Sequence, residues 1–171
     1  MRGNILLNRK FAAVAIAAAV ALGTTGCTFT SPVASLKQYD PSDGVNTMVG
    51  KIGVRNFMYL TTATGQGALF GTLVNQDVDA VATTVGLHAH GSTSTAEIPV
   101  SVGAGEKLDL GYNGGQAIPL GITAKAGELI ELHVSVGAEK VTLNVPVLDG
   151  TFAQYAPLVN SLGNLTTPEK K

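Results

Sequence analysis

Two histidines near the middle of the chain form its densest group of potential metal ligands. His88 and His90 are separated by a single alanine, and residues two apart on an extended strand project to the same face. Imidazole is a ligand for copper, zinc and nickel. A closed site needs further ligands, and the spacing of Met48, Met58 and His133 does not place them beside His88. The pattern leaves open a metal site and a plain pair of histidines at a strand end.

The other residues that could do chemistry fall in expected turns and loops. Asp77 and Asp79 belong to a polar stretch between two strands, where aspartate is common because it bonds to nearby backbone. The glycine-rich segment from residue 111 to 116 has no helix after it, so it lacks the helix N-terminus that a phosphate cradle uses. No serine lies in a Gly-x-Ser-x-Gly elbow. We therefore expect no enzyme and no cofactor, with copper at His88 and His90 as the alternative.

The single cysteine, Cys27, stands at the end of a secretory signal. Three basic residues precede an apolar run from residue 11 to 22, and the small residues 23 to 26 lead to the cysteine. A helix of that run would span roughly 18 Å, less than the roughly 30 Å core of a bilayer. A signal peptide over residues 1–26 is therefore favoured over a permanent transmembrane helix. One cysteine also excludes an intrachain disulfide.

The position of Cys27 directly after Gly26 resembles the lipobox of bacterial lipoproteins, although Thr24 stands where that pattern prefers leucine. The resemblance implies cleavage before Cys27 and lipid attachment to it. Two or three acyl chains hold a protein firmly on a membrane. We expect a lipid-anchored protein on the outer, periplasmic face of the cell membrane; the alternative is a plain secreted protein with a free thiol.

The part of the chain beyond the signal is weakly acidic and low in charge. Charged residues make up 13% of the sequence, against about 25% in ordinary soluble domains. Beyond Gly26, twelve Asp and Glu residues outnumber eight Lys and Arg residues, which gives a formal net charge of −4. Nucleic-acid binding needs a basic face, so we expect no nucleic-acid partner.

Composition divides the remainder into three segments. Residues 27–45 are rich in Pro, Ser and Thr and predict a tether, either a disordered spacer or a docking strand. Residues 46–150 hold short β-prone runs between turn residues, and residues 151–171 form a C-terminal tail that packs on the domain or on a partner. The expected strands are residues 52–61, 68–75, 81–88, 97–102, 107–111, 116–122, 129–136 and 141–148.

Eight short strands without a helical stripe between them predict an all-β fold, an antiparallel β-sandwich or barrel. The clearest alternation lies in residues 129–136, where apolar side chains occupy every second position. Ile130 and Leu132 are expected on the inner face, and Glu131 and His133 on the outer face. A turn at residues 137–140 joins this strand to the next as a hairpin.

Three short segments resemble the LpqE-type lipoproteins of actinobacteria: residues 39–44, 52–56 and 71–75. That family is known as accessory subunits on the outer face of the respiratory supercomplex of cytochrome bcc (complex III) and haem-copper oxidase (complex IV). The resemblance implies a non-catalytic, membrane-tethered accessory subunit whose partners are the subunits of those two complexes.

A later stretch, residues 126–147, is similar to the closing hairpin of the periplasmic PCu(A)C copper chaperones. That resemblance implies a cupredoxin-like sandwich, with immunoglobulin-like pairing of two sheets. The chaperones bind Cu(I) through a His-x-Met pair and further Met ligands; here His88 fits, His90 stands where Met is expected, and a mid-chain Met would fall near Phe70 or Gly71. Copper delivery to the oxidase is the alternative function, and binding of a small apolar ligand between the sheets is a third.

Overall fold

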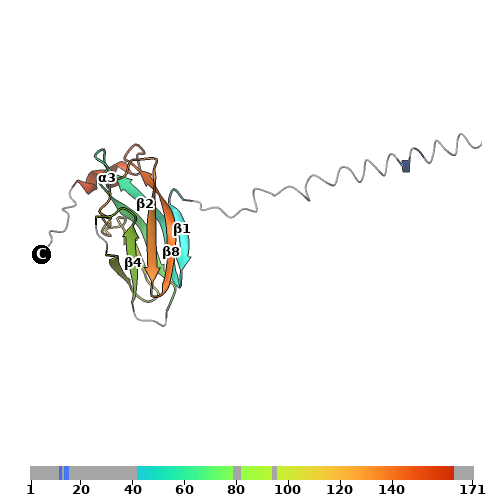
Figure 1. Ribbon diagram of the computed structural model, residues 1–171, viewed down its shortest axis with the longest axis horizontal. Coiled ribbons are helices and arrows are strands. Elements are labelled where there is room, and N and C mark those ends of the chain that lie inside the picture. The colour runs from blue at the N-terminus through green and yellow to red at the C-terminus, as the bar shows by residue number, and fades with distance from the viewer. Residues whose placement is uncertain (1–11, 13, 16–41, 79–81, 94–95, 164–171) are drawn as a thin grey trace, which may run out of the picture. The chain divides into compact units, whose positions relative to one another are not determined.

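The computed structural model describes residue 12 and residues 14–15, 42–78, 82–93 and 96–163 (Figure 1). The chain divides into two units, Met1–Tyr39 and Asp40–Lys171. In the first unit the described residues are helical. The rest of the predicted signal peptide, Cys27 and most of the predicted tether lie outside the described residues, as does the end of the tail. Among the residues described, no helix combines the length and the apolar character that crossing a membrane requires.

The second unit is built from β-strands, which confirms the predicted fold class. Most strands match the expected ranges to within two residues; the segments 45–49, 116–122 and 156–162 differ. The elements are β1 (Val45–Val49), β2 (Ile52–Thr61), β3 (Gly67–Asn75), β4 (Thr83–Ala89), β5 (Ile98–Val102), β6 (Lys107–Leu110), β7 (Leu129–Val136), β8 (Glu139–Leu148) and α3 (Ala156–Leu162).

The strands form two layers that share one seam. One layer has the order β5-β4-β7-β8, and the other consists of β2, β3 and β6 with β1 paired to β2. All pairings within the layers are antiparallel, whereas β2 and β8 run parallel where Tyr59 pairs with Val147 and Leu60 with Leu148. The sandwich is thereby nearly closed along this side (Figure 1). This short parallel seam was not expected from the sequence.

Asn56 divides β2 into two halves that serve different neighbours. It has a φ of 51°, and the register with β3 shifts between Arg55 and Met58. β1 pairs with β2 from Ile52 to Phe57, and β8 pairs with it at Tyr59 and Leu60. The Asn56 side chain accepts a hydrogen bond from the Gly44 N–H (2.9 Å), and its own N–H donates to the Asn46 side chain (2.8 Å). The bulge lets one strand edge change partners.

The expected strand at residues 116–122 is wrong. This segment makes only isolated bridges, Leu69 with Ile118 and Gln66 with Thr123. Pro119 has no N–H to donate, and Gly121 has a φ of 67°. Both features interrupt a strand ladder. The segment is therefore a loop that is bridged to β3 at Leu69.

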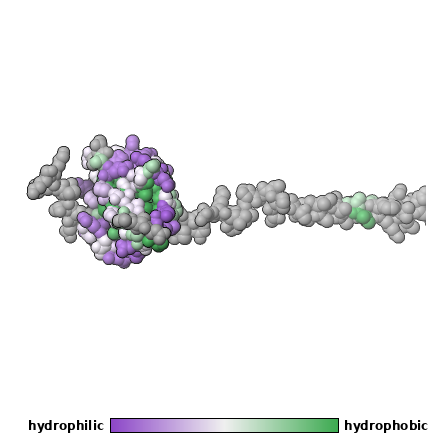
Figure 2. All heavy atoms as spheres, turned by 90° about the horizontal axis from the view of Figure 1, so that it is seen from below, coloured by the Kyte–Doolittle hydropathy of each residue, from purple (hydrophilic) through white to green (hydrophobic). Residues whose placement is uncertain are grey.

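The apolar core lies between the two layers. Its fully buried members include Val54, Phe57, Tyr59, Leu87 and Leu132. A second, smaller cluster covers the opposite face of β2 and β3, where α3 and the preceding Tyr155 pack on Met58, Leu60 and Phe70. The described part of the C-terminal tail therefore packs on the sandwich, which was one of the two placements expected for it. On the face shown in Figure 2, a band of hydrophobic residues lies among hydrophilic ones.

Candidate functional site

Three potential metal ligands lie on the outer face of β4 and β7, and a fourth, His90, follows directly after β4. His88 pairs directly with His133 in the antiparallel ladder, and the His90 N–H donates a hydrogen bond to the Glu131 carbonyl (2.9 Å). The ladder thus continues one rung beyond β4 and sets His90 opposite Glu131. Ile130, Leu132 and Val134 face the core, as the alternation predicts. We call His88, His90, Glu131 and His133 the outer quartet.

The two strand histidines lie side by side. Their imidazole rings are nearly parallel, with an interplanar angle of 7° and ring centroids 6.1 Å apart. His133 Nδ1 lies 3.0 Å from Thr142 Oγ1 on β8, and His133 Nε2 lies 3.4 Å from Glu131 Oε1. The His133 side chain is 22% exposed and that of Glu131 is 48% exposed. A solute can therefore reach this part of the sheet.

A polar cluster borders the quartet on the same sheet. The Ser135 hydroxyl donates to Glu97 Oε2 (2.6 Å), and Lys140 Nζ lies 3.6 Å from Glu97 Oε1. The hydrogen bond from Ser135 holds the pKa of Glu97 below its usual value, and the charges of Lys140 and His88 lower it further. Glu97 is therefore an anion already bonded to its neighbours.

Because Gly86 has no side chain, the side chains of Glu97 and Ser135 have room to pack over it. A Cβ at residue 86 would lie 2.2 Å from Glu97 Oε2 and 2.4 Å from Ser135 Oγ. Any larger residue would displace the carboxylate from its hydrogen bond. The packing of side chains across the outer face thus explains why residue 86 is a glycine. The sequence alone did not indicate this role.

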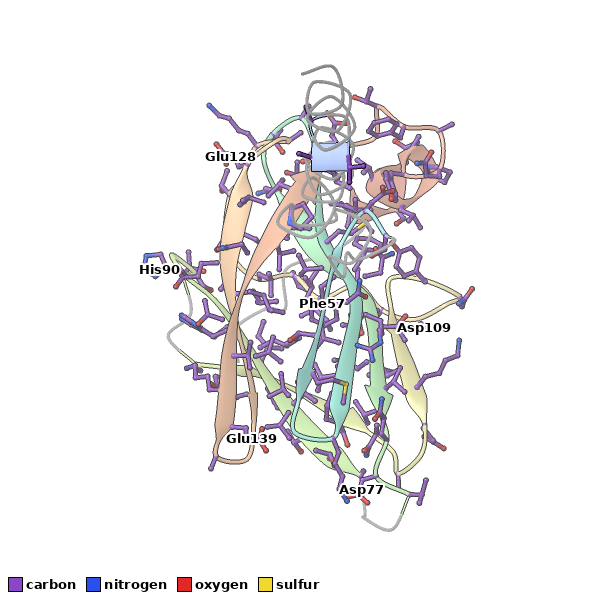
Figure 3. All side chains as sticks on the ribbon, turned by 90° about the vertical axis from the view of Figure 1, so that its right-hand side faces the viewer. Phe57, Asp77, His90, Asp109, Glu128 and Glu139 are labelled. Atoms are coloured by element: carbon purple, nitrogen blue, oxygen red, sulfur yellow. The ribbon has the colours of Figure 1, made fainter. Side chains whose placement is uncertain are left out.

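The sequence suggested that His88 and His90 form a pair, but the structure places only one of them within a strand. His88 lies on β4, while His90 follows the end of that strand and projects from the edge of the sheet (Figure 3). The side chain stacked on His88 is His133, which its spacing in the sequence did not place beside His88. Within residues 42–78, 82–93 and 96–163, no three His, Asp or Glu side chains converge closely enough to surround an ion.

Neither methionine considered as a further ligand lies near the quartet. Met58 is fully buried under α3, and its sulfur contacts the Tyr112 hydroxyl at 3.4 Å. Met48 is on β1 in the other layer, where its sulfur lies 3.5 Å from Arg55 Nη2. The outer quartet therefore offers nitrogen and oxygen ligands, without a thioether.

The expected turn and loop assignments agree with the described structure. Asp77 follows β3, its N–H bonds to the Asn75 side chain (3.0 Å), and Lys51 Nζ lies 2.9 Å from its carboxylate. Asp79 lies outside the described residues. The glycine-rich segment 111–116 is a loop after β6, in which Asn113 has a φ of 49°. These residues shape turns.

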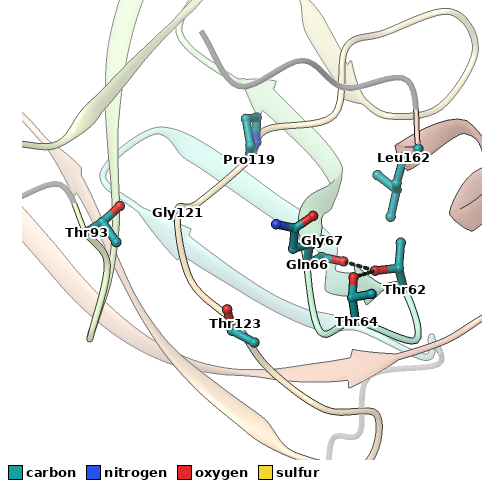
Figure 4. Close-up of a pocket in the computed structure, with 10 residues that line it drawn as sticks. Thr62, Thr64, Gln66, Gly67, Thr93, Pro119, Gly121, Thr123 and Leu162 are labelled. Atoms are coloured by element: carbon teal, nitrogen blue, oxygen red, sulfur yellow. Dashed lines mark hydrogen bonds between the residues drawn. The ribbon is translucent and has the colours of Figure 1, made fainter. Parts of the chain in front are cut away.

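A surface pocket lies at the end of the sandwich near α3 (Figure 4). Its volume is about 480 Å³, and its lining includes Thr62, Thr64, Gln66 and Thr123. Thr62 and Thr64 are hydrogen-bonded to each other (2.9 Å), and Thr62 also donates to the Gln66 carbonyl (2.9 Å). This pocket is open to solvent, and its lining is both polar and apolar, since Pro119 and Leu162 also contribute to it.

Comparison with solved structures finds domains of similar fold. No family model and no curated protein matches the chain. The domain is similar to PCuAC domains. The copper-bound PCuAC domain from PmoF2 is 15% identical with a TM-score of 0.49, covering 61% of this chain and 98% of that chain. The apo PCuAC domain from PmoF1 is 18% identical with a TM-score of 0.44, covering 60% and 98%. Likeness at this level is no argument for what this chain binds.

Proposed function

We propose that this chain is a lipid-anchored accessory protein on the outer face of the cell membrane, which acts without catalysis by binding a partner. The resemblance of residues 39–44, 52–56 and 71–75 indicates the cytochrome bcc and haem-copper oxidase assembly as that partner. Cys27 carries the anchor. Confinement to a thin layer above the membrane raises the effective concentration of the domain, so a modest interface suffices.

The observation that carries this proposal is a pair of exposed apolar side chains at one end of the sandwich. Leu129 is 65% exposed and Phe152 is 56% exposed. Leu129 begins β7, next to Glu128, and Phe152 lies between β8 and α3; Glu128 and α3 are at the same end (Figures 1 and 3). Exposed large apolar residues of this kind are suited to a protein interface.

This end is also the end where the segment from the predicted anchor joins the domain. Asp43, two residues before β1, accepts a hydrogen bond from the Tyr155 hydroxyl, and Tyr155 stacks edge-on with Phe152 at 6.4 Å. We therefore assign the partner contact to Phe152 and Leu129.

The segments that carry the family resemblance support the same proposal because they adjoin in the structure. Ile52–Arg55 pairs residue by residue with Thr72–Asn75, and Gly44 is bonded to the Asn56 side chain. Residues 42–44, 52–56 and 71–75 adjoin in one part of the sandwich. Such an arrangement is what a shared structural unit would produce.

Affinity purification of the tagged, full-length chain from mild detergent tests the proposal. We expect bcc and oxidase subunits to be recovered with the wild-type protein. Phe152→Ser should reduce that recovery several-fold, whereas Val78→Ser, at a residue 74% exposed beside Asp77 at the opposite end, should not. Equal recovery with both variants would remove Phe152 from the interface, and no recovery with the wild type would refute the partner.

Copper delivery to the oxidase is the second candidate, and the accessibility of His88 on the outer face favours it. In its sequence form this function uses His88 and His90. Cu(I) titration of the purified domain beside a His88→Ala/His90→Ala variant tests it; an affinity that is unchanged in the variant would remove that pair as the copper site.

A further inference from the structure

We propose that Met48 is a site of reversible oxidation, where a peroxide converts the thioether to a sulfoxide and the new oxygen is held by the Arg55 guanidinium and the Gln76 amide. The site lies on the layer formed by β1, β2 and β3, which does not carry the outer quartet. It does not depend on the respiratory partner proposed above.

Exposure distinguishes Met48 from the other methionine in the described part of the chain. Met48 is 39% exposed, whereas Met58 is fully buried and its sulfur contacts the Tyr112 hydroxyl at 3.4 Å. An oxidant must touch the sulfur to transfer an oxygen to it, so oxidation of a side chain follows its exposure. A dissolved peroxide therefore reaches Met48 and is kept from Met58.

Strand register brings two N–H donors to the Met48 sulfur. Met48 pairs with Gly53 of β2, and Arg55 is two residues further along β2 and therefore on the same face. Gln76 comes directly after β3. Arg55 Nη2 lies 3.5 Å from Met48 Sδ, and Gln76 Nε2 lies 3.8 Å from it. A Cβ at residue 53 would lie 3.2 Å from Arg55 Nη2 and 3.5 Å from Met48 Sδ, so the glycine leaves room for both groups.

Both donors are held in place by bonds that do not involve the sulfur. Arg55 Nη1 donates to the Thr47 carbonyl (2.9 Å) and to the Val54 carbonyl (3.0 Å). The Gln76 backbone N–H donates to the Lys51 carbonyl (2.9 Å). The N–H groups that face the sulfur are thus positioned before any oxidation takes place.

These donors suit a sulfoxide better than a thioether. A thioether sulfur is a weak hydrogen-bond acceptor, whereas a sulfoxide is polar and its oxygen accepts hydrogen bonds. A charged guanidinium makes shorter and stronger bonds to an oxygen acceptor than a neutral donor does. Among the described residues Arg55 makes no ion pair with a carboxylate. Its Nη2 is therefore available to an oxygen on Met48.

The step is a two-electron oxidation of sulfur by a peroxide. The Met48 sulfur gives an electron pair to one peroxide oxygen, and the S–O bond forms as the O–O bond breaks. The proton of the transferred hydroxyl passes to the leaving oxygen, which departs as water, or as an alcohol from an alkyl peroxide. A sulfoxide reductase reverses the change with a dithiol, which becomes a disulfide as the oxygen leaves as water.

Peptide mass spectrometry of the full-length chain, purified in mild detergent and exposed to hydrogen peroxide for increasing times, tests the site. Met48 sulfoxide should form about tenfold faster than Met58 sulfoxide. Dithiothreitol with the two methionine sulfoxide reductases, one for each epimer, should restore Met48. Met48→Leu, which nearly conserves volume, should remove the early oxidised species. Equal rates at the two methionines would overturn the proposal.

Thermal melting tests the two donors, with each oxidised protein compared with its own reduced form at a time when only Met48 is oxidised. Oxidised wild type should melt at or above the reduced protein. Oxidised Arg55→Gln and oxidised Gln76→Ala should each melt below their reduced forms, because the sulfoxide oxygen has lost a donor. Lys51→Gln removes a cation that is paired with Asp77 on the same side of the hairpin; it is the matched control and should behave like the wild type.

The comparison within each variant removes any effect that the substitution itself has on the fold. An oxidised wild type that loses as much melting temperature as the two donor variants would overturn the role of Arg55 and Gln76. Either result leaves the respiratory partner to its own test.

Discussion

The Tyr155 hydroxyl donates a hydrogen bond to the Asp43 carboxylate, across 112 positions of the chain. Asp43 leads into β1, and Tyr155 immediately precedes α3. The Tyr155 side chain is buried with the second apolar cluster, and burial together with the bond to Asp43 raises its pKa. The contact fastens the first described residues of the domain to its last element.

Tyr155→Phe should lower the free energy of unfolding by about 1.5–3 kcal/mol, because a hydrogen bond to a charged acceptor is lost while the ring packing is kept. Urea denaturation followed by circular dichroism measures it. Asp43→Asn, which keeps an acceptor without the charge, is the matched control and should cost less. Equal stability of the wild type and Tyr155→Phe would mean that the contact does not hold the helix.

Asn56→Ala should destabilise the sandwich by about 2–3 kcal/mol. The left-handed conformation costs an alanine roughly 1–2 kcal/mol, and the acceptor of the Gly44 N–H is lost as well. Asn56→Gly, which tolerates the positive φ but also loses the acceptor, should cost about 1 kcal/mol. Thermal melting measures the stability of both variants. An alanine variant as stable as the glycine variant would contradict the claim that the positive φ of Asn56 matters for the fold.

Asp109 should contribute to stability in neutral solution and lose that contribution in acid. Hydrogen bonds from Asn113 and Thr72 (each 2.8 Å) and from Lys107 (3.1 Å) hold its pKa down to about 2. In the unfolded chain an aspartate has a pKa of about 3.9. A depressed folded-state pKa stabilises the fold above the unfolded value, and the gain disappears as the pH falls toward 2.

Asp109→Asn should therefore be less stable than the wild type by about 1 kcal/mol at pH 7, a value reduced for solvent screening. The two proteins should converge as the pH falls to about 2. Urea denaturation at several pH values checks this. A difference that stays constant from pH 7 to pH 2 would show that the charge of Asp109 is not its cause.

Cys27→Ala should release the protein from the membrane fraction. The lipobox-like order at Gly26-Cys27 predicts lipid on this residue, and acyl chains supply the anchoring energy. Intact-mass spectrometry should find an acylated Cys27 at the N-terminus of the mature wild-type chain. A mature chain that begins with unmodified Cys27, or with another residue, would contradict the anchor.

Local pattern predicted the faces of the strands well. In residues 129–136 one face is buried, so the two-residue period alone sets Leu132 inward and His133 outward. Pattern failed where local signals were weak or misleading. β1 is short and borders the polar tether, residues 116–122 look β-prone but contain Pro119 and Gly121, and α3 has seven residues and depends on packing.

The candidate site could be predicted only in part, for a different physical reason. His88 and His133 are 45 positions apart, and their proximity depends on β4 lying next to β7 in one particular register. Strand order is set by the whole core and turn arrangement, which no short segment contains. The alternation of the sequence does indicate that residues 131 and 133 face outward. Their neighbours on that face can be named only once the adjacent strand is known.

The proposed membership of this domain in the respiratory assembly is tested most directly by measuring the composition of that assembly. The supercomplex is purified through a tagged oxidase subunit in mild detergent, and this chain is quantified by mass spectrometry relative to the oxidase. The account predicts near-stoichiometric recovery from wild-type cells and a marked loss from cells carrying Cys27→Ala. Supercomplex that is intact and active yet never contains this chain would contradict it.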